Sequence, residues 1–309
     1  LAGDRGNFDS HWQEIAERVM PSVSTLFQSR GGQVSKGEKR NTEIFDSTAA
    51  LALLKFGSIL DSLLTPSNAT WHRLAANDES VNRDREVKLY FETLNRILFK
   101  YRYAAKGNFV SQNQMTYKSL GAFGTGSLFI DELWGEPGIR YRAIHLGELY
   151  IAENHQGQVD KAYRRFTMTC RQAVQKWGEK LPPTILAAVE MTPEREFDFI
   201  HCVRPRKEGY DPNRSDFRGM KFESVYVSIE GKAELSEGGY EVFPYTTPRY
   251  EQAPNEVYGR SPAMDVLPAI KTLNEQKKTM LKQGHRAVDP VLLVHDDGII
   301  DAFSLRPGA

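Results

Sequence analysis

The chain has 309 residues, of which 40% are hydrophobic and 26% are charged, a composition typical of a water-soluble globular protein with two folded units. Its 40 Lys and Arg residues balance 40 Asp and Glu residues, which excludes a global polycation or polyanion. The two cysteines, Cys170 and Cys202, can build neither a disulfide framework nor a paired-cysteine zinc knuckle, so we expect reduced thiols. The most apolar window, residues 49–64, contains Lys55 and Asp61 and is shorter than the roughly 20 apolar residues of a bilayer span, which predicts no membrane anchor.

Hydrophobic spacing predicts that the first third of the chain is helical. Pro21 predicts a kink in the first helix, and Ser29 to Arg40 is a loop rich in Gly, Ser and Lys. The second helix, which Thr42 can cap, is apolar almost all round, so we expect it in a core or between subunits. Asn108 can cap the fourth helix. The predicted helices are residues 7–27, 42–64, 81–105 and 109–123.

The hydrophobic period changes near Gly126 to short β-rich runs separated by Gly, Pro and Asn, the pattern of an antiparallel meander. Thr167 is predicted to cap a short helix, residues 168–177, which Gly178 closes, and a second short helix follows Pro182-Pro183. The predicted strands are residues 127–133, 139–146, 148–152, 159–166, 196–204, 222–229 and 240–246.

A long helix pattern then runs over residues 261–288, with Pro262 at the favoured first turn and Pro268 as the place for a kink. At 1.5 Å per residue this helix is about 40 Å long. Beyond it, residues 291–294 are predicted as a strand and residues 295–298 as a turn. The predicted fold class is therefore α+β, with a helical N-terminal third, an antiparallel β-rich middle and a long C-terminal helix.

At 100° per residue, the long helix presents an apolar arc, a basic stripe beside it and an uncharged polar arc opposite. Between Gly259 and Val288 there are six Lys or Arg and two acids, although Glu275 lies in the basic stripe and weakens it. A single stripe of three Lys binds DNA feebly, but a ring of copies multiplies the number of phosphates contacted. The apolar arc is Ala263, Val266, Leu267, Ile270, Leu273, Met280, Leu281, Gly284 and Val288; the basic stripe is Lys271, Lys278, Lys282 and His285; the polar arc is Thr272, Gln276, Thr279 and Gln283.

The glycine motifs do not predict a nucleotide site. Gly32 and Gly37 have the spacing of a phosphate loop, but Glu38 and Lys39 stand where Lys and Ser or Thr are required. The glycines within residues 121–126 precede a predicted strand, whereas the dinucleotide fingerprint must follow one. No GxSxG, HExxH or CxxC motif occurs.

Acidic groups leave open a metal-dependent phosphoryl-transfer enzyme or nuclease. The candidate groups are Asp131 with Glu132, Asp198 with His201, and Asp296 with Asp297. Asp198 and His201 are three apart on a predicted strand and should point to opposite faces, and residues 296–298 have the composition of a turn. We therefore predict no metal, no cofactor and no catalytic residue.

Several motifs follow one another in a fixed order. Residues 163–165, Tyr-Arg-Arg, lead into a Thr-x-x-Cys-x-x-Ala-x-x-x-Trp-Gly helix, and residues 258–262, Tyr-Gly-Arg-Ser-Pro, open the long helix. That helix contains Leu-Asn-Glu at 273–275 and leads to Asp-Pro at 289–290 and then Val-Leu-Leu-Val. In this order the chain resembles, over most of its length, the head-to-tail connecting (portal) proteins of short-tailed, T7-like bacteriophages.

The resemblance implies a ring of identical, non-enzymatic subunits, typically twelve, at one capsid vertex of the virion, assembled in the host cytoplasm. Residues 1–257 would form the wing, with helices over 8–124 and a β-rich part over 126–257. Residues 258–290 would form the stem helix, and residues 291–309 the start of the clip, so that the chain is truncated relative to a whole family member. The implied partners are further copies of the chain, double-stranded DNA, terminase, scaffold and capsid proteins, and tail adaptors.

A channel that passes every DNA sequence needs no base-reading motif and only modest charge. Either the basic stripe, which includes His285, or the Thr and Gln arc is therefore expected to face the bore. The expected subunit contacts are Leu51, Leu54, Leu267, Ile270 and Leu281. A structural adaptor that binds only protein is a further alternative, and it predicts that the lysines of the stripe turn outward.

Overall fold

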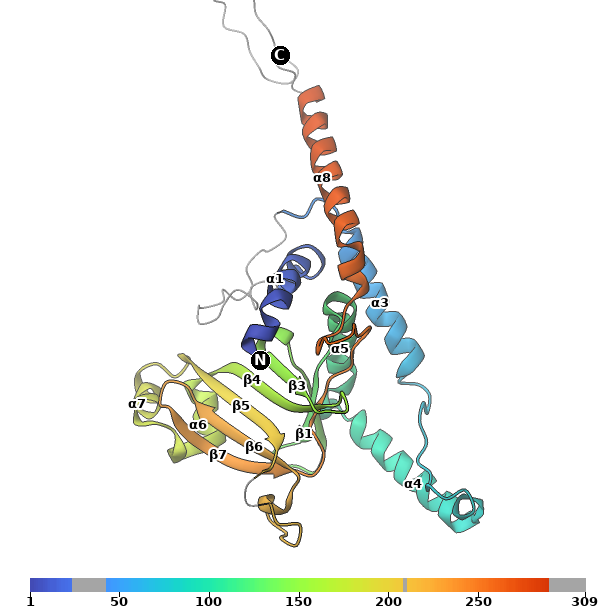
Figure 1. Ribbon diagram of the computed structural model, residues 1–309, viewed down its shortest axis with the longest axis vertical. Helices are drawn as coiled ribbons and strands as arrows, with labels where there is room; N and C mark the ends of the chain where they lie inside the picture. The colour runs from blue at the N-terminus through green and yellow to red at the C-terminus, as the bar shows by residue number, and fades with distance from the viewer. Residues whose placement is uncertain (24–42, 208–209, 289–309) are drawn as a thin grey trace, which may run out of the picture.

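The computed structural model describes residues 1–23, 43–207 and 210–288 (Figure 1). It confirms the α+β class, with helices first, antiparallel sheets in the middle and a long helix after them. The predicted loop at 29–40, strand at 291–294 and turn at 295–298 lie outside the described residues. The α-helices are α1 (Ala2–Val19), α3 (Thr48–Leu64), α4 (Arg85–Arg102), α5 (Phe109–Phe123), α6 (Cys170–Trp177), α7 (Pro183–Met191) and α8 (Pro262–Val288). The strands are β1 (Leu128–Glu132), β2 (Ile139–Ala143), β3 (Leu149–Glu153), β4 (Val159–Thr169), β5 (Glu196–Pro205), β6 (Phe222–Ser228), β7 (Ala233–Tyr240) and β8 (Tyr245–Thr246).

The first two helices differ from the prediction at their ends. α1 begins at Ala2 and stops at Val19, because Pro21 has no N–H with which to continue it, and a 3-10 turn follows. α3 begins at Thr48 after Ser47 at the N-cap. The predicted start at Thr42, which itself lies outside the described residues, is therefore wrong.

The next two helices match the prediction in type and place. The Asp84 side chain accepts a hydrogen bond from Glu86 N at 2.9 Å and begins α4, which ends at Arg102. Short 3-10 helices flank α4, so the predicted continuous helix over 81–105 is too long at both ends. Asn108 does precede α5, but its backbone is left-handed and its side chain makes no capping hydrogen bond.

The β-rich middle forms two antiparallel sheets. Strands β3-β4-β5-β6-β7 make a five-stranded sheet in sequence order, and β2-β1-β8 make a three-stranded sheet. β7 was not predicted, and the predicted strand over 240–246 is confined to the two residues of β8. The short helix α6 is capped by Thr169 rather than Thr167, because β4 continues to Thr169 and Gln172 completes a capping box with it.

The core lies on one face of the five-stranded sheet. At one end, α6 and α7 bury Phe166, Ile185 and Phe199. At the other end, α1, α5 and the three-stranded sheet pack around Trp12, whose indole N–H donates to Phe123 O at 3.1 Å. Within the part of the chain that the structure describes, none of the helices has the length and apolar run needed to cross a bilayer.

The start of α8 is fixed against the end of α5. Ser261 Oγ donates to Ala122 O at 2.8 Å and accepts from Met264 N at 3.1 Å, which caps α8. Gly124 and Gly259 meet backbone to backbone: a Cβ on either would lie 2.3 Å from the carbonyl oxygen of the other. The direction of α8 is therefore set by the body of the protein.

α8 runs unbroken for 27 residues through Pro268, a length of about 40 Å. In Figure 1 it extends well beyond the sheets and the other helices. This confirms the long continuous helix predicted from the sequence.

Candidate functional site

The candidate site is the surface of α8, which packs against the body only through its first turns. Ala263, Met264 and Leu267 are buried, and Ile270 is half-buried against the same core. From Lys271 onward the side chains are exposed, apart from two that are half-buried against the chain segment before α3. Most of the helix surface is therefore left uncovered by the described part of the chain.

Asn274 anchors the middle of α8. Its Oδ1 accepts hydrogen bonds from Phe45 N at 2.8 Å and Asp46 N at 3.2 Å, and its Nδ2 donates to Glu43 O at 3.1 Å. One side chain thus satisfies three backbone groups of the segment that leads into α3. The sequence places Asn274 within the predicted helix, but no local pattern predicts this role.

The basic stripe is divided by these contacts. Lys271 forms an ion pair with Glu14 of α1 at 2.6 Å, and this hydrogen bond holds the pKa of the Glu14 carboxyl below its usual value. Lys278 lies 3.9 Å from Glu43 and over the ring of Phe45, whose centroid is 5.4 Å away. Lys282 and His285, further along, are exposed. The first two lysines therefore turn toward their own chain.

The uncharged polar arc lies on the side of α8 that faces away from those contacts. Thr272, Gln276, Thr279 and Gln283 are all exposed. The Thr272 hydroxyl donates to the carbonyl oxygen of Pro268, one turn back in the helix, at 3.0 Å. The arc is thus a continuous row of hydroxyl and amide groups without charge.

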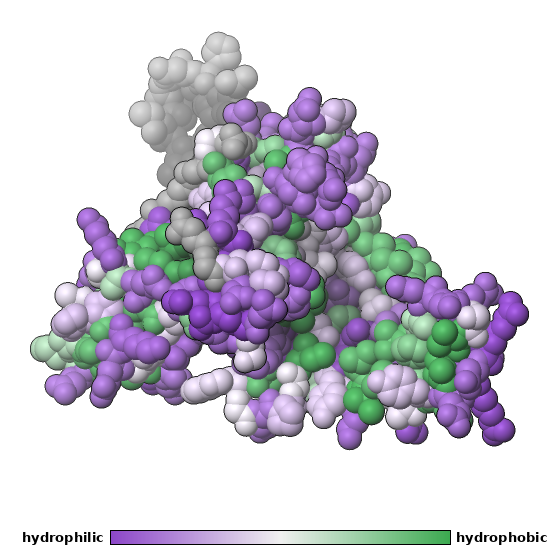
Figure 2. Space-filling view, turned by 60° about the horizontal axis from the view of Figure 1, so that its bottom comes forward, coloured by the Kyte–Doolittle hydropathy of each residue, from purple (hydrophilic) through white to green (hydrophobic). Residues whose placement is uncertain are grey.

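The five predicted subunit contacts fall into two groups. Leu267 is only 5% exposed and belongs, with Ile270, to the packing of its own chain. By contrast, Leu51 and Leu54 on α3 and Leu281 on α8 are 61%, 48% and 52% exposed. Further apolar side chains are exposed on α4, including Leu89, Tyr90 and Ile97. Figure 2 shows green patches on this lobe, at the right.

Comparison with known proteins gives these surfaces a context. Residues 1–309 match the family described as bacteriophage head to tail connecting protein. The chain belongs to this family. It is 29% identical over 313 residues to a portal protein of Salmonella phage epsilon15, an alignment that covers 100% of this chain and 55% of that protein. It is also 29% identical over 282 residues to a probable portal protein of Bordetella phage BPP-1, covering 90% of this chain and 49% of that protein.

The chain therefore spans about half the length of the curated portal proteins that it matches, 55% and 49%. The match confirms the resemblance drawn from the ordered motifs of the sequence. Both relatives are named as portal proteins, and the comparisons lend no support to the enzyme alternative.

The carboxylates that this alternative required do not converge in the described part of the chain. Asp198 pairs with Arg165, whereas His201 is buried on the other face of the sheet, as the strand spacing predicted. Asp131 lies on a different strand, β1. Among the residues that the structure describes, no group of three or more His, Cys, Asp or Glu side chains could hold a metal ion. Residues 296–297 lie outside the described residues.

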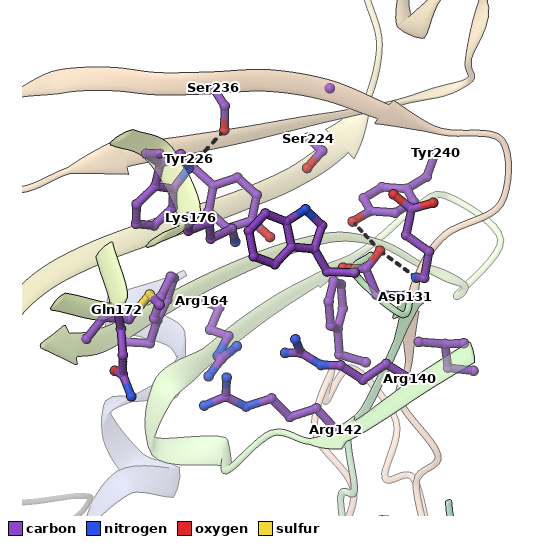
Figure 3. Close-up of a pocket in the computed structure, with 18 of the residues that line it drawn as sticks. Asp131, Arg140, Arg142, Arg164, Gln172, Lys176, Ser224, Tyr226, Ser236 and Tyr240 are labelled. Atoms are coloured by element: carbon purple, nitrogen blue, oxygen red, sulfur yellow. Dashed lines mark hydrogen bonds between the residues drawn. The ribbon is translucent and has the colours of Figure 1, made fainter. Parts of the chain in front are cut away.

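The structure also shows a pocket that the sequence analysis missed. It has a volume of ≈ 1240 Å³ and lies between the two sheets and α6. Figure 3 shows Arg140, Arg142, Arg164 and Lys176 in it. The alternation of Arg140 and Arg142 on one strand was the available signal, but its meaning depends on β4 and α6, which only the fold brings to the same place.

Proposed function

We propose that the chain is a subunit of a portal, the ring at one capsid vertex through which double-stranded DNA is packaged and later ejected. The observation that carries the proposal is α8, a helix of 27 residues that extends from the body with separate apolar and polar surfaces exposed. An exposed apolar arc of this length is stable when a neighbouring helix covers it, and repetition around an axis provides that neighbour. Membership of the head-to-tail connecting family supports this assignment.

In the proposed ring, each subunit contacts the next through a head-to-tail interface that closes on itself, with twelve copies as the expected number. The contact surface is formed by exposed apolar side chains: Leu51 and Leu54 on α3 and Leu281 on α8. Leu267 and Ile270 act indirectly, by holding the start of α8 on the body.

Within the ring, we assign the bore to the uncharged arc. Thr272, Gln276, Thr279 and Gln283 are exposed, whereas Lys271 and Lys278 contact their own chain. Hydroxyl and amide groups neutralise no phosphates, so a wall made of them lets DNA slide without tight binding. Lys282 and His285, which are exposed on the basic stripe, provide modest positive charge.

The same proposal divides the chain into a wing over residues 1–257, a stem over 258–290 and the start of a clip over 291–309, the last outside the described residues. The clip would meet the terminase during packaging, and later the tail adaptors, while capsid and scaffold proteins surround the ring. The protein would act in the virion after assembly in the host cytoplasm.

Electron microscopy in negative stain and mass photometry test the proposal directly, on the purified protein with any flanking sequence that its gene encodes. We expect rings with a central hole and the mass of about a dozen subunits. Leu281→Glu combined with Leu54→Glu should abolish the rings while leaving the circular dichroism spectrum unchanged. Met191→Glu, at an exposed apolar position on α7, is the matched control. A protein that stays monomeric at high concentration would contradict the proposal.

DNA binding by the ring tests which arc faces the bore. Gln276→Lys with Gln283→Lys should raise the affinity for duplex DNA and steepen its dependence on salt, because each added lysine contacts a phosphate in every subunit. Thr184→Lys, at an exposed position of α7, is the control. If the paired substitution leaves DNA binding unchanged while rings still form, the arc does not face the bore. If charge reversal at Lys282 also leaves DNA passage unchanged, the protein-only adaptor is favoured.

A further inference from the structure

The pocket in Figure 3 is built where the covered face of the five-stranded sheet meets the hairpin β1–β2. On β2, Arg140 and Arg142 are two residues apart and therefore share a face. Across the ladder they pair with Asp131 and Phe129 of β1, which line the same pocket. The hairpin thus presents two arginines to the space between the sheets.

Two further cations enter from other elements. Arg164 of β4 is buried and its side chain faces the pocket, while Lys176 comes from α6. The Lys176 ammonium lies 3.6 Å from the centroid of the Tyr226 ring, which holds it against the sheet. Figure 3 shows the guanidinium groups of Arg140, Arg142 and Arg164 pointing into the same space.

The pocket has too few acids for its cations. Arg164 is neutralised by Glu148 at 2.9 Å, and Glu237 is already paired with Arg206 at 2.7 Å, so neither adds to the balance. The remaining charged lining residues are Arg140, Arg142, Lys176 and Lys180 against Asp131 and Glu132. Among the described residues, no ion pair joins these four cations to an acid.

The electrostatic consequence appears on two of the cations. Burial, together with the smaller effects of Arg140, Arg142 and Arg164, lowers the pKa of Lys176 to about 8 against the opposing effect of Asp131. Burial and the neighbouring Arg164 likewise lower the pKa of the Arg142 guanidinium. Like charges have thus been gathered in a partly desolvated space, an arrangement that a bound anion would relieve.

We propose that this pocket binds a multiply charged phosphate-type oxyanion, either a free di- or polyphosphate or the phosphates of a nucleic-acid strand. A single carboxylate would neutralise only part of the excess positive charge in the pocket, whereas a phosphate group with two or more negative charges matches that excess. Arginine guanidinium groups also hold phosphate oxygens in a bidentate fork. The proposal concerns the wing rather than the bore, and it does not depend on ring formation.

A hydroxyl completes the site. Ser236 Oγ accepts a hydrogen bond from the Trp177 indole at 3.3 Å, so its own proton can be donated into the pocket. The exposed Trp134 stands in the lining as well, and its ring offers a stacking surface if the phosphate belongs to a nucleotide.

Titration calorimetry with inorganic pyrophosphate tests the proposal on the purified protein. We expect binding to the wild type and at least a ten-fold loss in Arg140→Gln/Arg142→Gln. The control is Arg171→Gln/Arg195→Gln, which removes two exposed arginines that do not line the pocket. Because the pocket variant removes repelling charges, it should keep its fold, and its melting temperature without ligand should equal or exceed that of the wild type.

The source of the phosphate is resolved by a second ligand. A short single-stranded oligonucleotide with a 5′-phosphate, titrated beside pyrophosphate, should bind more tightly only if the nucleic-acid strand is the natural source, and Trp134→Ala should then remove that advantage. Pyrophosphate binding that is equal in the pocket variant and the control variant would overturn the proposal, as would binding of a Glu-rich peptide with no binding of pyrophosphate.

A pH series provides an independent readout. As pH rises from 7 to 9, the affinity of the wild type for pyrophosphate should fall relative to that of Lys176→Gln, because Lys176 loses its proton in that range. Comparing the two proteins at each pH cancels the effect of the titration of pyrophosphate itself. The charged and titratable groups around Lys176 are Asp131 of β1, Arg140 and Arg142 of β2, Arg164 of β4, His201 of β5 and Tyr226 of β6. A parallel fall in both proteins would show that Lys176 does not contact the anion.

Discussion

Two histidines, the half-buried His145 and the buried His201, are expected to make the fold sensitive to acid. Burial lowers the pKa of His145 to about 3, and burial also holds the pKa of His201 well below its usual value. His145 Nδ1 accepts from Gly147 N at 3.0 Å, and both ring nitrogens of His201 are hydrogen-bonded, to Tyr245 and Ser224. Each ring is therefore kept neutral in the folded protein while it can be protonated in the unfolded chain.

The pH dependence follows from this difference. Below pH 6.5 the unfolded chain binds protons that the folded protein does not, so stability falls as pH falls, by about 1.4 kcal/mol per pH unit for each histidine until the folded pKa is reached. Urea unfolding at pH 7 and pH 5 should show this loss, and His201→Gln should reduce it. His155→Gln, at an exposed site, is the control and should behave as the wild type; an equal loss in all three proteins would contradict the assignment.

The contact between Gly124 and Gly259 gives a second prediction at single residues. Gly124 has φ of 75°, and an added Cβ would overlap Gly259 O at 2.3 Å, so Gly124→Ala combines backbone strain with a clash against backbone. We expect a loss of about 2–4 kcal/mol in the free energy of unfolding, measured by urea denaturation. Gly6→Ala, at an exposed position of α1 with open space around it, should instead stabilise the protein by about 0.5–1 kcal/mol. A neutral Gly124→Ala would show that the junction can relax.

At the scale of elements, the sequence was most informative where local pattern and tertiary role agree. The helices α5 and α8 carry strong periodicity and clear boundaries, and both appear where predicted. β7 was not predicted, because its sequence AELSEGGY has few β-branched or aromatic residues. The strand forms through its pairing with β6. Likewise, Thr167 and Thr169 are equally good caps locally, and the pairing of β4 with β5 up to Thr169 decides between them.

Tertiary proximity is the other limit, and it affects the candidate site most. The three stripes of α8 follow from helical geometry, but which of them faces the body depends on Glu14 and Glu43, far away in the sequence. The cationic pocket is assembled from a hairpin, a strand and a helix that no local pattern connects. Helix type and surface pattern could thus be predicted, whereas partners across the fold could not.

Asn274 supplies the prediction at this scale, because it joins α8 to the segment before α3. Asn274→Ala removes the side chain that accepts from Phe45 N and Asp46 N, and we expect those two amides to exchange hydrogen faster by about ten-fold in native-state exchange. The global stability should fall by about 1 kcal/mol. Gln276→Ala, two residues along and exposed, is the control. Unchanged exchange at both amides would mean that another group holds the segment.

For the whole molecule, the exposure of apolar side chains separates those that stabilise one chain from those that we propose to contact a neighbouring subunit. α3 carries both kinds: Leu53 is 6% exposed and packs in the core, whereas Leu63 is 72% exposed. A helix that is apolar almost all round was expected in a core or between subunits. In the single chain it is only partly buried, which leaves its other side for a neighbour.

The two leucines therefore predict opposite results from the same substitution. Leu53→Ala should cost about 2–4 kcal/mol in the free energy of unfolding of the dilute protein, because it leaves a cavity that the core fills only in part. Leu63→Ala should change that free energy by less than about 0.5 kcal/mol, since the side chain is already in water. In the assembled ring the order should reverse: at a protein concentration where wild type and Leu53→Ala are both folded and ring-shaped by mass photometry, Leu63→Ala should shift the distribution toward single subunits. If Leu63→Ala destabilised the dilute chain as much as Leu53→Ala, the outer side of α3 would be packing against its own chain, and the free surface assigned to the neighbour would have to be sought on α4 and α8 instead.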